Sequence, residues 1–229
     1  MKCVLAGWVC GVTMWSGVLA AAPPQEAVDT VLTKIDASAQ KIRTFQAKFV
    51  QTTVSKALDE KDVASGVLYF VKKEAAQAEQ PPVLLLRFDY KEPDASVMIM
   101  NEAQVIFQKP GFEPETHHLV DDLKTDTLLA GFTSTARLRE HFLIKLGRQT
   151  ESRVTLILSP VSDTACRTFR ELRLTFNRAT WLPVAVYQHK VNDERITFQF
   201  SEIRVNYTIP PEMFTAQSLK KPGQKPAGR

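Results

Sequence analysis

Most of the chain consists of short segments in which apolar and polar residues alternate, completely in some and partially in others. Alternation is the period of a half-buried β-strand. The segments are 45–51, 63–71, 83–90, 97–100, 105–107, 154–158, 172–176, 184–187 and 196–200. Residues 172–176 and 196–200 alternate throughout, which predicts a sheet with one buried and one solvated face. Turn-forming residues at 91–94, 110–111, 159–160 and 191–194 separate the segments, as in antiparallel meanders.

Two parts of the chain show helical periodicity instead. Apolar residues spaced three or four positions apart predict an amphipathic helix over residues 26–41; they are Val28, Val31, Leu32, Ile35 and Ile42. Residues 126–132 and then 133–141 predict two short helices that interrupt the sheet, because Thr125 or Asp126 can cap the first helix and Gly131 can end it. The polar, alanine-rich segment 73–81 predicts a long exposed loop. The pattern indicates a mainly β (α+β) fold.

The first twenty residues have the features of an export signal. Lys2 precedes an uncharged apolar run, 3–20, which ends in the small residues 20–22. We expect cleavage after Ala20 or Ala21; the alternative is an uncleaved anchor, because about 18 apolar residues can just span a bilayer. Cleavage would leave Cys166 as the single cysteine and exclude an intramolecular disulfide. We therefore predict a signal peptide at 1–20, one domain at 21–215 and a basic flexible tail at 216–229.

Charge does not indicate a nucleic-acid-binding protein. The formal net charge is +4, and much of the positive charge lies in the tail rather than on one face of the domain. The tail favours a frayed terminus, with weak attraction to anionic lipid headgroups as the alternative.

Polar motifs do not indicate an enzyme either. No nucleophile with its base, paired carboxylates, metal cluster or phosphate loop stands out. His117 and His118, close to Asp121 and Asp122, have the side-chain types of a metal site, but neighbouring strand residues point to opposite faces. A solvated loop is favoured there, and an inert, buried or half-buried thiol is favoured for Cys166. We expect no catalytic residue, metal or cofactor.

Four short motifs follow one another in a characteristic order. They lie at residues 44–51, 66–70, 86–93 and 128–131 and read TFQAKFVQ, GVLYF, LRFDYKEP and LLAG. In this order they resemble the LolA family of outer-membrane lipoprotein carriers, over residues 27–214. The resemblance implies an unclosed antiparallel β-barrel with an N-terminal helix, and short lid helices over an apolar concave face.

The resemblance also implies a function. A member of this family is a periplasmic, non-enzymatic monomer that binds the acyl chains of lipoproteins in an apolar cavity and ferries them from the inner to the outer membrane. Its implied partners are acylated lipoproteins, an inner-membrane ABC-type releasing complex and an outer-membrane acceptor. A periplasmic sensor or regulator with a lipoprotein-binding half-barrel is the alternative on the same fold.

Binding residues are assigned by the same resemblance. It places Leu128, Leu129 and Phe132 on the lid, and we assign Leu84, Leu86 and Phe88 to the lipid-binding face.

The chain differs from the family at the residues that hold the lid shut. An arginine and a proline after the GxLxf strand often hold the lid shut, and Lys72 and Lys73 stand at those positions. Lysine cannot form the bidentate fork of arginine, so the lid would be held differently. Lys72 and Arg87 are the candidates for this role. Arg87 is equally well interpreted as an outward-facing strand residue, since Leu84, Leu86 and Phe88 define the opposite face.

Overall fold

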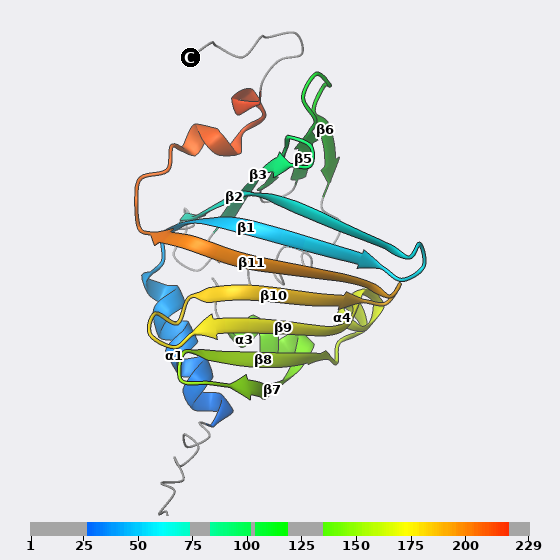
Figure 1. Ribbon diagram of the computed structural model, residues 1–229. Coiled ribbons are helices and arrows are strands. Elements are labelled where there is room, and N and C mark those ends of the chain that lie inside the picture. Colours follow the sequence, from blue (N-terminus) through cyan, green and yellow to red (C-terminus); the bar gives the residue numbers. More distant parts are fainter. Residues whose placement is uncertain (1–26, 74–82, 102–103, 119–134, 220–229) are drawn as a thin grey trace, which may run out of the picture.

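The computed structural model describes residues 27–73, 83–101, 104–118 and 135–219, and one long antiparallel sheet dominates them (Figure 1). Its eleven strands lie in the order β6-β5-β4-β3-β2-β1-β11-β10-β9-β8-β7. The sheet is not closed, because β6 and β7 form its two edges. The predicted mainly β, unclosed antiparallel architecture is therefore confirmed.

Each of the nine predicted strands is present, and each extends beyond the predicted bounds. The strands are β1 (Thr44–Ser55), β2 (Glu60–Lys73), β3 (Val83–Glu92), β4 (Ser96–Asn101), β5 (Gln104–Gln108), β6 (Glu115–His118), β7 (Phe142–Gln149), β8 (Arg153–Pro160), β9 (Phe169–Asn177), β10 (Pro183–Lys190) and β11 (Glu194–Val205).

Strands β6 and β7 and the short helix α4 (Asp163–Thr168) are not predicted by the sequence pattern. β6 contains no apolar residue, and β7 begins directly after a helix with no turn residue between them. The prediction of a loop at His117 and His118 is wrong, because both residues pair with β5 as part of the edge strand, but His117 is solvated as expected.

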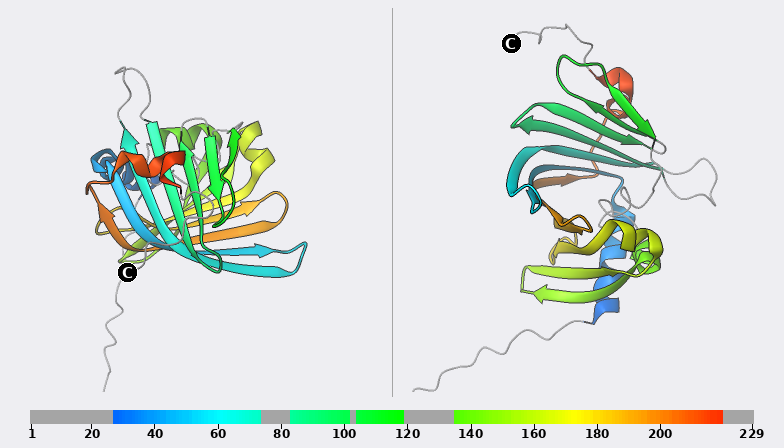
Figure 2. Two further views of the ribbon diagram at one scale, coloured as in Figure 1. Left: turned by 90° about the horizontal axis from the view of Figure 1, so that it is seen from above. Right: turned by 90° about the vertical axis from the view of Figure 1, so that its right-hand side faces the viewer.

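Helices α1 (Val28–Lys41) and α3 (Thr135–His141) agree with two of the predicted helices. The predicted helix at 126–132 lies outside the described residues. Val31, Leu32 and Ile35 of α1 are buried in the main apolar cluster. Figure 2 shows the sheet curving around the side that carries α1 and α3. Among the described residues, no helix combines the length and apolarity needed to cross a bilayer.

Asp36 of α1 fixes the first residue of α3. Its Oδ1 accepts a hydrogen bond from the backbone N–H of Thr135 at 2.7 Å, and its Oδ2 accepts one from Thr135 Oγ1 at 2.7 Å. Thr135 is buried, so solvent cannot replace these acceptors. One carboxylate therefore caps the helix and joins the two helices across 99 residues of chain.

Asp36→Ala is expected to lower the free energy of unfolding by about 1–2 kcal/mol, because it leaves two buried donors of Thr135 without acceptors. Urea titration measures the loss. Asp29→Ala is the matched control, since Asp29 also joins α1 to α3, but by an exposed ion pair with Arg139 at 2.6 Å. It should cost no more than about 0.5–1 kcal/mol. Equal losses in the two variants would contradict the capping role.

After β11 the chain forms two short 3-10 helices, η1 (Pro211–Phe214) and η2 (Ala216–Ser218). Phe214 and Leu219 are buried. The predicted start of a flexible tail at residue 216 is therefore wrong, because apolar side chains hold the chain to the sheet as far as Leu219. Residues 220–229, like the predicted leader and loop, lie outside the described residues.

Candidate functional site

The side of the sheet that carries α1 and α3, here called the concave face, is lined by large apolar side chains. Strand register brings these residues of β1, β2, β3 and β11 to that side: Phe45, Ala47, Phe49, Leu68, Phe70, Leu86, Phe88, Phe198 and Phe200. Phe49 is central among them. Its ring centroid lies 5.5 Å from that of Phe88, 5.1 Å from that of Tyr90 and 6.1 Å from that of Phe198. The first two contacts are edge-to-face, the geometry that aromatic quadrupoles favour.

Three of the predicted lipid-binding residues lie on this face. Leu86 and Phe88 are fully buried in the cluster and Leu84 packs against it. Their contact with an acyl chain stays a prediction. The predicted lid residues Leu128, Leu129 and Phe132 lie outside the described residues, so their position also stays a prediction.

Between the phenylalanine cluster and the β1–β2 hairpin, the concave face carries the polar side chains of Gln51, Thr53 and Tyr90. Tyr90 Oη donates a hydrogen bond to Gln51 Oε1 at 2.9 Å, and Gln51 Nε2 donates one to Thr53 Oγ1 at 3.2 Å. Burial raises the pKa of Tyr90 to about 12, because the phenolate would lose its hydration. Along these strands the side chains of the concave face therefore change from aromatic hydrocarbon to hydrogen-bonded polar groups within a few residues.

Stability is expected to fall as pH rises from about 10 to about 12. The unfolded chain releases the Tyr90 proton near the ordinary pKa of 10, whereas the folded chain retains it to about 12. Between these two pKa values the folded protein holds one proton more than the unfolded chain. Raising the pH over this interval therefore lowers the free energy of unfolding by about 1–3 kcal/mol. Tyr90→Phe should make the decline shallower in urea titrations across this pH range. An identical decline in the variant and the parent would exclude Tyr90 as its source.

The opposite side of β2–β5, here called the convex face, is apolar as well. It carries Tyr69, Val71, Val83, Leu85, Val97, Ile99 and Ile106, which pack against Ile209, Met213, Phe214 and Leu219 of the C-terminal segment 207–219. The expectation of one solvated sheet face therefore fails for β3 and β4, which are buried on both sides. Strands covered on both sides carry nearly continuous apolar runs, as residues 83–86 do.

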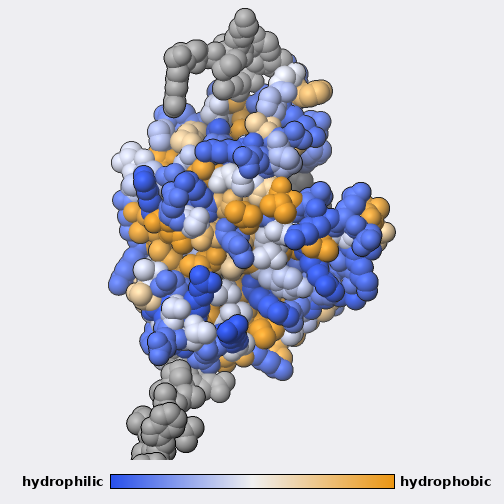
Figure 3. Space-filling model, in the orientation of Figure 1, coloured by the Kyte–Doolittle hydropathy of each residue, from blue (hydrophilic) through white to orange (hydrophobic). Residues whose placement is uncertain are grey.

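The rest of the convex face is solvated. Figure 3 shows apolar residues interspersed with polar ones over the surface of β1, β11 and β10 that faces the viewer. Val50 and Val63 are exposed there, among threonine and charged side chains.

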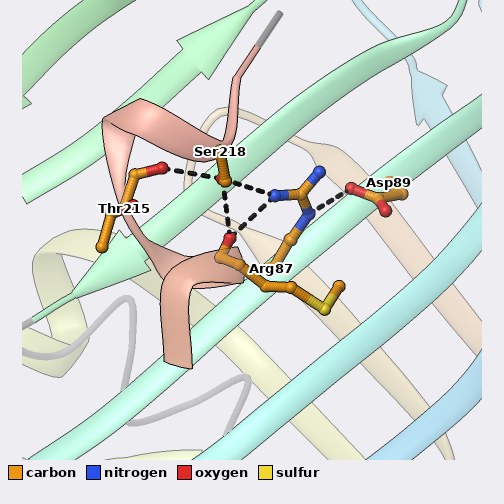
Figure 4. A network of polar contacts seen from close by, with 5 residues as sticks. Arg87, Asp89, Thr215 and Ser218 are labelled. Carbon is orange, nitrogen blue, oxygen red and sulfur yellow. Dashed lines mark hydrogen bonds and ion pairs between the residues drawn. The ribbon is translucent and has the colours of Figure 1, made fainter. Parts of the chain in front are cut away.

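Arg87 lies on the convex face and binds the C-terminal segment (Figure 4). Its Nε donates to Asp89 Oδ1 at 2.6 Å, and its Nη1 donates to the Met213 carbonyl oxygen at 2.7 Å and to Ser218 Oγ at 2.8 Å. The side chain is only 11% exposed. Strand alternation directs its guanidinium away from Leu86 and Phe88 and towards the C-terminal segment. Its contact with the lid stays a prediction, because the lid residues lie outside the described residues. The alternative, an outward-facing strand residue, is correct, although the side chain is covered.

Lys72 lies on the concave side, opposite Leu84 in the β2–β3 register. Its Nζ donates to the carbonyl oxygen of Ala39, in the last turn of α1, at 3.3 Å. A cation at a helix C-terminus is favourable, because the last carbonyl groups carry partial negative charge. Lys72 thus joins β2 to α1, while any contact with the lid stays a prediction.

Metal-binding and nucleophilic side chains do not form a site within the described ranges. No three His, Cys, Asp or Glu side chains come together there to hold a metal ion. Cys166 is exposed on α4, which corrects the expectation of a buried or half-buried thiol.

A depression of about 400 Å³ lies where the β1–β2 hairpin meets the β10–β11 turn. Its lining is mainly charged: Lys56, Asp59, Glu60, Lys61, Asp193 and Arg195. A hydrogen bond from His189 lowers the pKa of Asp193, and Arg170 adds to the effect. This depression therefore does not suit an acyl chain.

The sequence matches the family described as "Outer membrane lipoprotein carrier protein LolA" over residues 40–217, which is most of the chain. The match includes all the described strands and η1, and it ends within η2. No curated protein sequence matches the chain.

Several solved structures are similar to this chain at low sequence identity. A crystal structure of MucB is 12% identical, with a TM-score of 0.48, over 82% of this chain and 62% of the MucB chain. A LolA superfamily protein from Nitrosomonas europaea is 11% identical, with a TM-score of 0.42, over 85% of this chain and all of its own. The lipoprotein LppX of Mycobacterium tuberculosis is 7% identical, with a TM-score of 0.42, over 80% and 100% of the two chains. This chain thus spans about three fifths of MucB.

Proposed function

The chain belongs to the LolA family of outer-membrane lipoprotein carrier proteins, and from this premise we propose that it binds the acyl chains of lipoproteins on its concave face. In this proposal it is a periplasmic carrier, exported by its N-terminal leader, that ferries lipoproteins from the inner to the outer membrane. It has no catalytic role and works as a monomer.

The observation that carries the proposal is the aromatic lining of the concave face. Phe49, Phe88 and Phe198 form one continuous aromatic cluster across three strands, on the side of the sheet that carries α1 and α3. Burial of an acyl chain is worth about 0.8 kcal/mol per methylene. A long chain bound to such a surface would therefore be held by about 10 kcal/mol.

A carrier that binds its cargo this tightly must also be able to release it. A segment that covers the apolar face in the absence of cargo offsets part of the binding energy, because cargo must displace it first. We assign this role to the segment that contains Leu128, Leu129 and Phe132, following the family motif. An inner-membrane ABC-type complex would load the carrier, and an outer-membrane acceptor would receive the cargo.

Native mass spectrometry of the protein isolated from its own periplasm, without detergent, tests the proposal. We expect a fraction with the added mass of an acylated protein, and loss of that mass after incubation with outer membranes. The sensor or regulator alternative predicts a stable complex with a membrane protein instead. Isolated protein that carries no acylated partner, and that fails to bind a synthetic diacyl lipopeptide in vitro, would refute the carrier function.

A further inference from the structure

Five basic residues gather at the end of the sheet where β1 begins. Lys41 is the last residue of α1, Arg43 precedes β1, Lys72 and Lys73 end β2, and Arg204 lies near the end of β11. Figure 1 shows these four elements meeting at the left-hand end of the sheet. All of these residues except the half-buried Lys72 are exposed. This end of the molecule, here called the basic end, therefore presents concentrated positive charge to solvent.

Hydrogen bonds between the four elements hold the basic residues together. Asn206, directly after β11, donates from Nδ2 to the Lys41 carbonyl oxygen at 2.8 Å, and its Oδ1 accepts from the Arg43 backbone N–H at 2.8 Å. The backbone N–H of Lys72 donates to the Arg43 carbonyl oxygen at 2.8 Å. Arg204 lies two residues before Asn206. Residues that are far apart in the sequence are thus fixed at one corner of the fold.

Acidic side chains do not balance this charge within the described segments 38–46, 69–73 and 201–207. The one acidic residue in these segments, Glu202, forms an ion pair with Lys48 at 2.6 Å. The opposite end of the sheet differs, because the depression between the β1–β2 hairpin and the β10–β11 turn is lined by three basic and three acidic residues. Concentrated positive charge thus distinguishes the basic end from the opposite end.

The spread of the charge fits a surface that carries many phosphates better than one bound anion. Lys73 lies two positions beyond the partner of Thr44, and Arg204 lies opposite Gln46, so their backbones are roughly 15 Å apart. Strands β1, β2 and β11 each have a strand on both sides, which leaves no open edge here for an extended acidic peptide. The exposed Val205 adds an apolar group beside Arg204, as at the interface of a bilayer.

We propose that the basic end binds the surface of a bilayer that contains anionic lipids, and that this contact orients the protein on the membrane. The inference goes beyond the proposed function and does not require acyl cargo, because headgroup phosphates make the contact. Phe45 and Phe70 of the concave face pair next to this end. A carrier oriented in this way brings one end of its apolar lining to the bilayer. The attraction is electrostatic and weakens with salt, so the contact is reversible.

Cosedimentation of the purified protein with vesicles tests the contact. The parent should bind vesicles of phosphatidylglycerol and phosphatidylcholine, bind less at high salt, and fail to bind phosphatidylcholine alone. Lys41→Gln, Lys73→Gln and Arg204→Gln should each lower the partition coefficient about fivefold, and the triple variant should lower it about 100-fold. The three side chains are exposed, so thermal unfolding of the variants should match that of the parent.

The triple variant Lys56→Gln, Lys61→Gln and Arg195→Gln is the matched control. It removes the same charge from the opposite end of the sheet, where acidic residues accompany these basic ones. It should bind anionic vesicles almost as tightly as the parent does. A loss as large as that of the basic-end variant would show that net charge alone governs adsorption, and would overturn the role of the basic end.

Cys166 provides an independent measurement of orientation. It is exposed on α4, which Figure 1 shows at the right-hand end of the sheet, and removal of the predicted leader leaves it as the single cysteine. A fluorophore on Cys166 should keep its emission on vesicles that carry a headgroup quencher. A fluorophore at Gln40→Cys, combined with Cys166→Ser, should be quenched, because Gln40 is exposed beside Lys41.

The outcomes separate this inference from the proposed function. Equal quenching at the two positions would overturn the orientation. Failure of the parent to bind anionic vesicles would overturn the contact itself and leave acyl binding on the concave face standing. Conversely, loss of lipopeptide binding in the parent would refute the carrier function without affecting the vesicle result.

Discussion

Gly66→Ala is expected to destabilise the protein by about 3 kcal/mol or more and to disrupt the pairing of β2 with β3. A Cβ atom at this position would lie 2.1 Å from the backbone oxygen of Asp89, 2.9 Å from its carbonyl carbon and 3.0 Å from Phe49 Cε1. The nearest obstacle is backbone, which cannot rotate away as a side chain can. Strand β3 would have to shift, and Phe88 would shift with it.

Thermal and urea unfolding of Gly66→Ala measure this effect, with Gly147→Ala as the matched control. Gly147 also lies in a strand, but a Cβ there would first meet Ile157 Cδ1 at 2.9 Å, the far end of a flexible side chain. We therefore expect a cost of about 1 kcal/mol for the control. A loss in Gly66→Ala no larger than that of the control would refute the close approach of β2 and β3.

Arg87→Met is expected to destabilise the protein by about 3 kcal/mol and to release the C-terminal segment 207–219 from the convex face. The substitution leaves the Asp89 carboxylate and the Met213 carbonyl oxygen without their donor. Removing one member of a covered ion pair costs more than the pair itself contributes, because the remaining charge stays poorly solvated. Asp89 is 28% exposed, which keeps the expected loss at the lower end of the range for buried pairs.

Hydrogen exchange distinguishes release of the segment from general destabilisation. Amides of residues 209–219 should exchange faster in Arg87→Met than those of β9, and a dye that binds apolar surface should report exposure of Leu85, Ile99 and Ile106.

The chain provides a close control for this variant in Arg173. Arg173 forms an ion pair with Glu171, two residues earlier on the same strand, at 2.7 Å. Sequence separation and distance are thus close to those of the Arg87–Asp89 pair at 2.6 Å, but the Arg173 side chain is 50% exposed. Arg173→Met should cost about 0.5–1 kcal/mol. Equal losses in the two variants, or unchanged exchange at residues 209–219, would contradict the role of Arg87 in holding the segment.

Strand alternation predicted most of the sheet because each element with a clear pattern buries one face. Residues 172–176 show this best: Leu172, Leu174 and Phe176 are fully buried, and the residues between them point outward. The failures have equally local causes. Strand β6 contains only polar residues and is held in the sheet by β5, and β7 follows α3 without a turn residue to mark the boundary.

For the candidate site, the sequence placed Leu84, Leu86 and Phe88 on one face but could not assign the partner of Arg87. That partner is a carbonyl oxygen 126 residues away, and local spacing carries no information about such a contact.

The sequence by itself determined most of the local order of this protein: where nine of the strands and the helices α1 and α3 lie, which side chains share a face, and which family motifs occur. These properties depend on residues only a few positions apart, because the periods of strand and helix are short. Tertiary structure alone decided that β3 is covered on both faces, that Asp36 caps a helix far along the chain, and that Arg87 holds the C-terminal segment. Each of these depends on which distant segment packs against a strand or helix, and that choice is made by the burial of the whole chain at once.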